Sequence, residues 1–207
     1  MKQEPAKGRR EEILAAAARC LAQHGYAKTT MEDVGREVGL NKASLYYYFK
    51  SKEHLVSEVI GSESAEYMQA LKGQVERVSG CANKITTYLV ERFRAFQRVV
   101  NLHNLSVQDM RRVGPQMKKL FAAVKHQELK YLGSILRHCV DRGEIRACDT
   151  DRLAAAILTV AEGFKMEHLV SPDTPQDAAV DYSGIEGEVV FTVRLMLEGL
   201  KQAPREG

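Results

Sequence analysis

Apolar residues recur at helical spacing along nearly the whole chain. Between residues 7 and 24, Ile13, Ala17 and Leu21 fall on one face of a helix, and Gly25 follows as a typical C-terminal cap. No stretch alternates apolar and polar residues with the β-branched enrichment that a strand requires. The pattern therefore predicts an all-α protein.

Two short helices are predicted directly after the first. Thr30 is a candidate N-cap for one of them, and Asp33, three residues later, occupies the capping-box position. Gly39 ends this helix, and Asn41 is a strong N-cap for the next, over residues 42–48. Two short helices joined by a glycine turn are the layout of a helix-turn-helix.

Longer helices are predicted beyond this unit, over residues 52–73, 81–102, 105–112, 115–142, 149–169 and 183–202. Gly114-Pro115 separates two of them, because proline disfavours the interior of a helix. The polar segment 171–184 contains two prolines and is predicted to be a flexible loop. We expect a helix-turn-helix head over residues 1–52 and a larger helical domain over residues 53–207.

The third helix carries three tyrosines between lysines, in the stretch KASLYYYFKSK. On a helical wheel, Leu45 and Phe49 turn toward the core. The opposite face and its flanks hold small, hydroxylated and aromatic residues: Ala43, Ser44, Tyr46, Tyr47 and Tyr48. Such a face fits the DNA major groove, which is about 12 Å wide. Packing is the alternative for the aromatic rings, although so short a helix cannot bury Tyr47 and Tyr48 together with Phe49.

The charge distribution also singles out the N-terminal quarter. The net charge is +3, and residues 1–55 hold ten Lys and Arg against seven Asp and Glu, whereas the rest is balanced. This excess is a weak indication of a polyanionic partner. No apolar run approaches the ~18 residues of a membrane helix, and the start lacks the apolar part of a secretory signal. We expect a cytoplasmic protein without membrane contact.

The cysteines and histidines do not predict a metal or cofactor site. Cys20, Cys81, Cys139 and Cys148 show no CxxC spacing, so reduced, packed thiols are expected rather than a disulfide framework. Cys148 is the candidate for a redox-sensing thiol. There is no HExxH, GxxxxGK[ST] or GxSxG pattern, and we therefore expect no metal, no cofactor and no enzymatic activity.

The N-terminal residues resemble the TetR family of bacterial transcriptional regulators. The similarity lies in Ile13-Leu14-Ala15-Ala16-Ala17, Gly25-Tyr26, Thr29-Thr30, Val34, Val38-Gly39, Lys42 to Phe49 and Ser51-Lys52-Glu53-His54-Leu55. Leu40 and Asn41 stand where the family often has valine and serine. The remaining residues match the family in length and helical character.

The resemblance implies a homodimer that binds a palindromic operator in double-stranded DNA and is released by a small-molecule effector. It implies a repressor, with an activator or a helical protein-interaction module as alternatives. It also assigns DNA contacts to residues on both sides of the turn between the two short helices. With Thr29 added from its place at a helix N-terminus, the predicted set is Thr29, Thr30, Lys42, Ala43, Ser44, Tyr46, Tyr47, Tyr48 and Lys52.

Two predicted helices near the C-terminus carry apolar stripes that could join two subunits in a four-helix interface. The predicted dimer interface consists of Leu153, Ile157, Val160, Phe164, Ile185, Val189, Val193, Met196, Leu197 and Leu200. Packing within one subunit is the alternative.

The middle helices contain aromatic residues and methionines that suit an apolar effector. The predicted lining consists of Tyr88, Phe93, Phe96, Leu105, Met110, Met117, Phe121, Tyr131 and Met166. Each could equally be a core residue. Arg92, Arg94 and Arg98 are interpreted as a solvated face, and nothing in the sequence identifies the effector.

Overall fold

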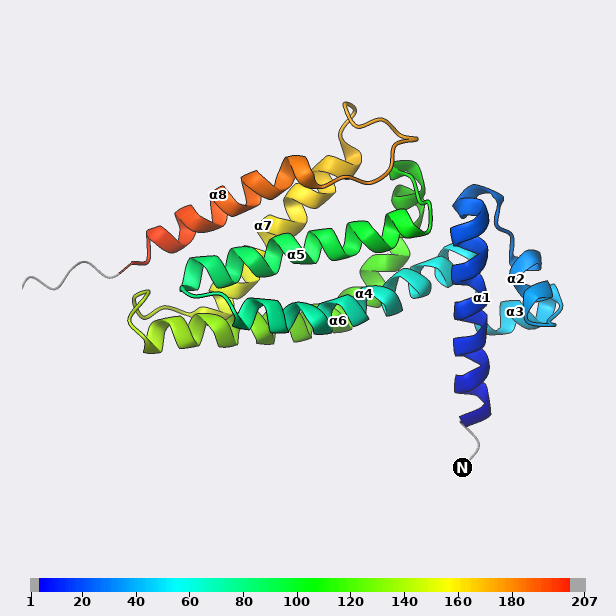
Figure 1. Ribbon diagram of the computed structural model, residues 1–207, viewed down its shortest axis with the longest axis horizontal. Coiled ribbons are helices and arrows are strands. Elements are labelled where there is room, and N and C mark those ends of the chain that lie inside the picture. Colours follow the sequence, from blue (N-terminus) through cyan, green and yellow to red (C-terminus); the bar gives the residue numbers. More distant parts are fainter. Residues whose placement is uncertain (1–3, 202–207) are drawn as a thin grey trace, which may run out of the picture. The chain divides into compact units, whose positions relative to one another are not determined.

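The computed structural model describes residues 4–201, apart from the side chains of residues 4–7, 119–121 and 123. In this part the elements are α1 (Glu4–Lys28), α2 (Met31–Glu37), α3 (Lys42–Tyr48), α4 (Lys52–Glu76), α5 (Cys81–Leu102), α6 (Val107–Asp141), α7 (Thr150–Val170) and α8 (Ser183–Glu198) (Figure 1). The only β pairing among the described residues is an isolated bridge between Ser106 and Ala179. The predicted all-α fold class is confirmed.

The predicted helix break at Gly114-Pro115 is wrong, because α6 continues through it. Pro115 lacks a backbone N–H and therefore removes one hydrogen bond from the helix. Val113 and Met117, on either side of it, are both buried and hold this part of α6 against its neighbours. Tertiary packing thus outweighs the local effect of one proline.

The described chain divides into two compact units. The first consists of residues 1–65, 96–121 and 172–180, and the second of residues 66–95, 122–171 and 181–207. Helices α4, α5 and α6 therefore contribute residues to both units. The domain boundary predicted after residue 52 lies inside the first unit and stays a prediction.

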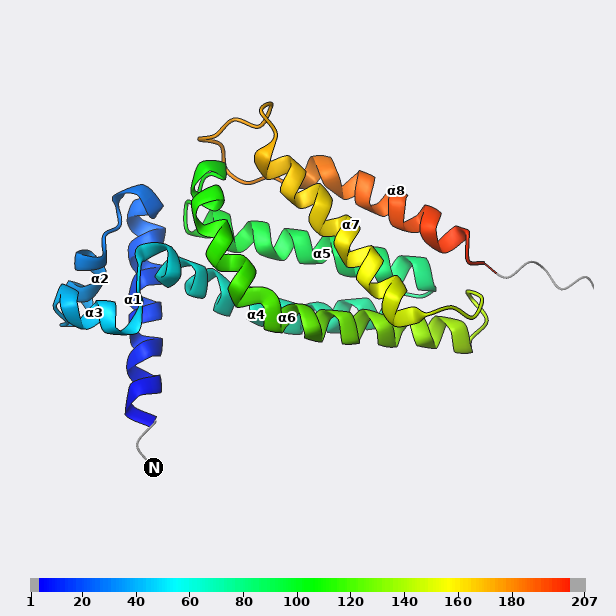
Figure 2. The same cartoon turned by 180° about the vertical axis from the view of Figure 1, so that it is seen from behind.

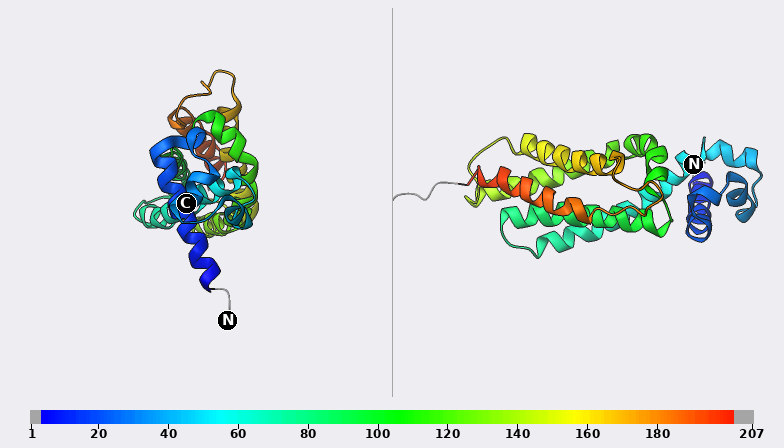
Figure 3. Two further views of the ribbon diagram at one scale, coloured as in Figure 1. Left: turned by 90° about the vertical axis from the view of Figure 1, so that its right-hand side faces the viewer. Right: turned by 90° about the horizontal axis from the view of Figure 1, so that it is seen from above.

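The first unit contains the helix-turn-helix, and α1, α2 and α3 lie together in both views of Figure 3. Its core is assembled from one face of each helix. Ile13 and Leu21 of α1, Leu45 of α3, Phe49 just beyond it and Ile60 of α4 are completely buried. α1 is interrupted at Gly25, whose φ of 73° is accessible to glycine at little cost. This confirms the predicted helix end.

The second unit contains α7 and α8, which lie side by side in the front and back views (Figures 1 and 2). Val189, Val193 and Leu197 of α8 and Ile157 of α7 are buried within it. None of the helices in the described part of the chain has the length and apolar character needed to span a bilayer.

The expectation of reduced cysteines is wrong for one pair. Cys81, the first residue of α5, and Cys139, near the end of α6, form a disulfide with a Cα–Cα distance of 5.6 Å. The two are 58 residues apart, and only the packing of α5 against α6 brings them together. Cys20, which is buried, and Cys148, which is half-buried, are free thiols.

Candidate nucleic-acid interface

The N-terminus of α2 is held by the predicted capping box. The Thr30 hydroxyl accepts a hydrogen bond from the Asp33 N–H at 3.1 Å, and the Asp33 carboxylate accepts from the Thr30 N–H at 3.0 Å. The hydrogen bonds from Thr30 hold the pKa of Asp33 below its usual value. Thr30 is exposed and remains available to a phosphate through the positive end of the helix.

Thr29 does not fit its predicted role in DNA contact. Its side chain is buried, with 4% of its surface exposed. Its hydroxyl donates to the carbonyl oxygens of Gly25 at 2.8 Å and Cys20 at 3.1 Å. Because these bonds tie Thr29 to the end of α1, it supports the head from inside.

The turn between α2 and α3 depends on two glycines. Gly39 has a φ of +67°, in the left-handed region that favours glycine. Gly35 accepts a hydrogen bond from the Leu40 N–H at 2.8 Å. A Cβ atom on Gly35 would lie only 2.7 Å from the Leu40 carbonyl oxygen. Gly39 is predicted from the sequence, whereas the role of Gly35 is not, because this close approach is a property of the folded turn.

α3 presents a polar and aromatic face outward. Its first turn is capped by Asn41, whose side chain accepts a hydrogen bond from the Ser44 N–H at 2.8 Å. Tyr47 is 86% exposed, and the ring of Tyr48 meets it edge-to-face at 5.4 Å. Lys42, Ala43 and Tyr46 are also exposed, and Ser44 is half-buried. The predicted inward and outward faces of α3 are therefore those of the folded head.

Two arginines of α1 fix the position of α3 from behind. The Arg10 guanidinium lies 4.6 Å from the centre of the Phe49 ring and forms an ion pair with Glu58. Arg9 donates to the Val38 carbonyl oxygen at 2.7 Å. Two of the ten basic residues counted in the N-terminal quarter are thus engaged with other residues of the head.

Lys52 also has a partner inside the head. Its ammonium donates to the Tyr26 carbonyl oxygen and lies 4.0 Å from the centre of the Tyr26 ring. The Tyr26 hydroxyl donates in turn to Glu53 at 2.9 Å. Burial lowers the pKa of Lys52. An ammonium has three donors, so Lys52 can still reach a phosphate, but it also stabilises the junction of α1 and α4.

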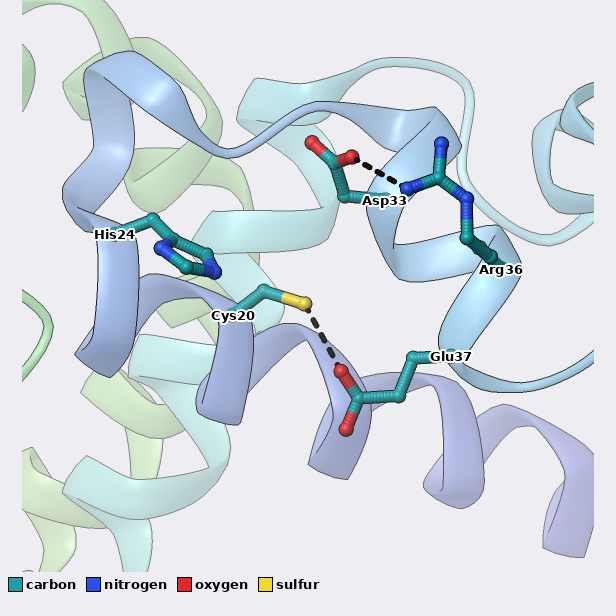
Figure 4. Close-up of a pocket in the computed structure, with 5 residues that line it drawn as sticks. All are labelled: Cys20, His24, Asp33, Arg36 and Glu37. Carbon is teal, nitrogen blue, oxygen red and sulfur yellow. Dashed lines mark hydrogen bonds and ion pairs between the residues drawn. The ribbon is translucent and has the colours of Figure 1, made fainter.

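An open pocket of about 280 Å³ lies beside the capping box (Figure 4). It is lined by Cys20, His24, Asp33, Arg36 and Glu37. The Cys20 thiol donates to Glu37 at 3.3 Å, and burial together with this carboxylate raises the pKa of Cys20 to about 11. Nowhere in the described part of the chain do three Cys, His, Asp or Glu side chains group so that they could hold a metal.

The predicted effector-lining residues are divided between the two units. Phe96, Leu105, Met110 and Met117 belong to the first unit, and Tyr88, Phe93, Tyr131 and Met166 to the second. Tyr88, Phe93, Leu105, Met110 and Met117 are buried, whereas Met166 is exposed. The side chain of Phe121 lies outside the described residues.

Arg92 does not belong to a solvated face, in contrast to the interpretation from sequence. Its guanidinium bonds to Glu128 and to Glu162, both at 2.5 Å, and Lys165 pairs with Glu162 at 2.6 Å. The Tyr88 hydroxyl donates to Glu128 at 3.1 Å. Burial disfavours the charge on Glu162, but Arg92 and Lys165 outweigh it and lower its pKa to about 2. This network is not visible in the sequence, because its members lie on three helices.

The predicted dimer residues divide into an inner and an outer set. Ile157, Val189, Val193 and Leu197 are buried within the chain and are therefore core residues, which corrects their assignment. Leu153, Val160, Phe164, Ile185, Met196 and Leu200 are half-buried. The most exposed apolar side chains of α7 and α8 were not predicted: Val170, Phe191 and Leu195. Apolar residues cover more than one face of these helices, and sequence periodicity does not show which face is turned to solvent.

A capped α2, a tight glycine turn and an outward aromatic face on α3 define a helix-turn-helix DNA-binding protein. Residues 13–59 match the family model described as bacterial regulatory proteins, tetR family. Over these residues the chain is similar to the TetR family. The relatives that it matches are named as transcriptional regulators or repressors.

Relatives are similar to the chain in sequence, and solved structures share its fold. The chain is 20% identical to the fatty acid metabolism regulator protein of Bacillus subtilis (strain 168), over 71% of this chain and 76% of that protein. It is 33% identical to the HTH-type transcriptional repressor KstR2 of Mycolicibacterium smegmatis, over 43% of each. A TetR-family regulator from Pectobacterium atrosepticum shares its fold, with a TM-score of 0.70 and 20% identity over 99% of this chain and 100% of that one.

Proposed function

We propose that this protein is a ligand-responsive transcriptional repressor that binds a palindromic operator as a homodimer. Residues 1–52 would read DNA, and residues 53–207 would dimerise and bind the effector. The exposed face of α3 is the observation that carries the proposal. Ala43, Ser44 and Tyr47 are available to base edges, and Thr30, Lys42, Tyr46 and Tyr48 are available to phosphates.

Dimerisation is supported by an exposed apolar surface on α7 and α8, here called the α7–α8 stripe. It consists of Gly163, Met166 and Val170 on α7 and Gly187, Phe191 and Leu195 on α8, all exposed and at helical spacing. Phe191 and Leu195 are 64% and 59% exposed. Two copies of this stripe could bury each other in a four-helix interface, and the glycines would allow close approach.

A dimer would present two copies of α3 to successive major grooves. These lie about 34 Å apart, so an effector that changes the spacing of the two heads would release the DNA. The effector must bind more tightly to one spacing than to the other. Equal head separations with and without the effector would contradict this mechanism.

We propose a small, mainly apolar effector. The charges of Arg92 and Lys165 are already balanced by Glu128 and Glu162. An ionic effector would have to break this network, and leaving a buried charge without its counter-ion is costly. The Bacillus relative is named as a regulator of fatty acid metabolism, which also favours an apolar ligand.

The protein would act where the bacterial chromosome lies, in the cytoplasm. An activator with the same head is the second candidate, since the geometry of α3 does not depend on the position of the operator. In vitro transcription from a promoter that overlaps the selected operator distinguishes the two. Repression requires that adding the protein lowers transcript yield.

The first experiment is selection of bound sequences from random duplex DNA at near-physiological salt. We expect enrichment of a two-fold palindrome whose half-sites are separated by a multiple of about 10 base pairs. Salt-sensitive binding to all sequences without enrichment would contradict sequence-specific regulation. The selected operator then serves in an assay for release by apolar ligands.

A further inference from the structure

Cys81 and Cys139 cross-link the start of α5 to the end of α6. Their Cα–Cα distance of 5.6 Å lies in the range of native disulfides. Both side chains are buried, with 6% and 3% of their surfaces exposed. Neither residue belongs to the predicted DNA-binding, effector or dimer surfaces.

The bond lies where several segments of the second unit meet. The Cys81 N–H donates to the Glu144 carboxylate at 2.6 Å, and Arg142 pairs with the same side chain at 3.1 Å. The Arg146 N–H donates to the carbonyl oxygen of Leu200, just beyond α8, at 2.7 Å. The disulfide therefore joins α5 and α6 beside the connection from α6 toward α7 and α8.

A permanent disulfide would be unusual in a protein that works at the bacterial chromosome. Thiol pools in that compartment keep cysteines reduced, and the disulfides found there are usually transient and serve catalysis or redox sensing. This step rests on the proposed function as a DNA-binding regulator. The cross-linked form is then one of two states, and the dithiol is the other.

We propose that Cys81 and Cys139 form a reversible redox site that is closed by hydrogen peroxide and that changes operator affinity. Burial of both sulfur atoms favours a small oxidant. Oxidised glutathione is bulky, and its S–S bond would have to line up with a buried cysteine sulfur before exchange could occur. α5 and α6 each contribute residues to both compact units. Cross-linking them therefore constrains two helices that also pack in the unit containing the helix-turn-helix.

The helix positions favour Cys81 as the cysteine that reacts first. Cys81 begins α5, where the helix dipole favours a thiolate, whereas Cys139 lies near the C-terminal end of α6, where the dipole disfavours one. The Glu144 carboxylate, which accepts a hydrogen bond from the Cys81 N–H, offsets part of this preference. The Cys81 thiolate attacks one peroxide oxygen. The S–O bond forms, the O–O bond breaks, and the departing hydroxide takes a proton to become water. This leaves a sulfenic acid on Cys81.

Cys139 then completes the disulfide. Its thiolate attacks the Cys81 sulfur, so that the S–S bond forms, the S–O bond breaks and a second water leaves with the remaining thiol proton. Two thiols have given two electrons to one peroxide. A dithiol reductant restores both thiols by exchange and is itself oxidised to a disulfide.

The other cysteines supply internal controls. Cys20 is outside the disulfide, so no second cysteine is in place to close a bond with it, and its pKa of about 11 keeps it protonated. Cys148 is half-buried and outside the disulfide. Neither should be converted to a disulfide at the peroxide concentration that closes the pair.

The test uses the full chain in both redox forms. Protein reduced with dithiothreitol is exposed to stoichiometric hydrogen peroxide or to oxidised glutathione, blocked with N-ethylmaleimide and mapped by mass spectrometry. We expect peroxide to close Cys81–Cys139 faster than oxidised glutathione does, and dithiothreitol to reopen it in folded protein. The closed form should melt about 5–15 °C higher than the open form.

Affinity for the selected operator is measured on the same two forms. We expect a change of at least about fivefold, the lower end of typical coupling between sites. Cys148→Ser should behave as wild type, and Cys81→Ser should lose the response. Comparing the two forms of the wild type does not depend on whether that variant folds.

Three results would overturn the proposal: no closure by peroxide, a bond that native reduction does not open, or equal operator affinity of the two forms. Failure of both forms to bind any DNA would instead overturn the proposed function. Mass spectrometry would still decide the chemistry at the cysteine pair.

Discussion

Side chains of the same type have different roles in this head, and burial decides which. Thr29 and Thr30 are adjacent, yet the hydroxyl of Thr29 is used inside the fold and that of Thr30 caps an exposed helix end. Tyr26 and Tyr47 differ in the same way. Tyr26 is buried and its hydroxyl bonds to Glu53, whereas Tyr47 faces solvent. Residue type alone therefore does not assign a DNA contact.

Tyr47→Ala is predicted to weaken binding to the selected operator by about 1–3 kcal/mol and to relax base preference at one position. The reason is that Tyr47 is the most exposed aromatic residue of α3 and lies on its outward face. Fluorescence anisotropy with the operator and its single-base variants measures both effects. Tyr67→Ala, an exposed tyrosine on α4, serves as the control. Unchanged base preference would remove Tyr47 from the base-reading set.

Lys42→Ala is predicted to weaken binding to all DNA sequences alike and to lower the slope of log K against log salt by about one unit. Lys42 is exposed in the first turn of α3, where its ammonium can lie near a phosphate. Titrations at several salt concentrations on specific and random DNA give the slope. Lys52→Ala should in addition lower the melting temperature, because that ammonium bonds to Tyr26. A change of sequence preference in Lys42→Ala would contradict a phosphate contact.

Individual elements are positioned by a few close contacts between them. The α2–α3 turn is the clearest case, since the backbones at Gly35 and Leu40 approach closely enough to exclude a side chain. In the second unit, the network around Arg92 joins α5, α6 and α7 through charge. Each arrangement can be tested by a change that leaves the helices themselves intact.

Gly35→Ala is predicted to destabilise the protein by about 1–3 kcal/mol, because the added Cβ meets a backbone oxygen that cannot move independently. Urea unfolding measures the change. The matched control is Gly114→Ala in α6, where nothing lies within 4 Å of the added Cβ. That variant should be stabilised by about 0.5–1 kcal/mol, since alanine favours a helix. Equal effects of the two substitutions would disprove the close approach in the turn.

Glu162→Gln is predicted to reduce the dependence of the free energy of unfolding on pH below about pH 4.5. The folded pKa of Glu162 is about 2, below its ordinary value of 4.5. Its ionised form therefore stabilises the fold above about pH 4.5, and that contribution is lost as the pH falls toward 2. We expect the wild type to lose about 1–2 kcal/mol more than the variant over this range. Urea unfolding at several pH values measures it.

Glu186→Gln is the control for this prediction. Glu186 pairs with Arg94, which is exposed, and exposed ion pairs contribute little to stability. Its profile should follow that of the wild type. A Glu162→Gln profile parallel to the wild type would show that the network does not lower the pKa of Glu162.

For the whole molecule, the proposed operator binding requires two heads and hence two chains. The α7–α8 stripe is an apolar surface left open among the described residues, since Phe191 and Leu195 extend into solvent from the outer side of α8. The buried side of the same helix, with Val189 and Val193, holds it to its own chain. One helix could thus serve intramolecular packing and assembly at once.

Phe191→Lys is predicted to raise the dimer dissociation constant at least about 100-fold, equivalent to roughly 3 kcal/mol. In a two-fold interface the introduced ammonium would be buried near its own symmetry copy. Sedimentation velocity measures the assembly state, and operator binding should become weaker and lose its two-site character. Leu102→Lys, which also replaces an exposed apolar residue, is the control. Dimers unaffected by Phe191→Lys would place the interface elsewhere.

The sequence alone predicts most of the local structure and the outward face of α3. Helical periodicity, the Thr30–Asp33 box and the Asn41 cap act over a few residues, so they are visible without the fold. The inward face of α3 is predicted in the same way, because Leu45 and Phe49 lie one helical turn apart and face the core together. The resemblance of the N-terminal residues to the TetR family followed from the combined spacing of these residues.

The tertiary structure decided whatever depends on contacts between distant segments. Only the fold brings Cys81 to Cys139, Arg92 to Glu128 and Glu162, and Gly35 to Leu40. It also decided which side of α8 is buried, since a stripe of apolar residues is equally suited to its own core and to a second subunit. Sequence periodicity gives the faces of a helix, and the packing of the other helices determines which face remains open to solvent.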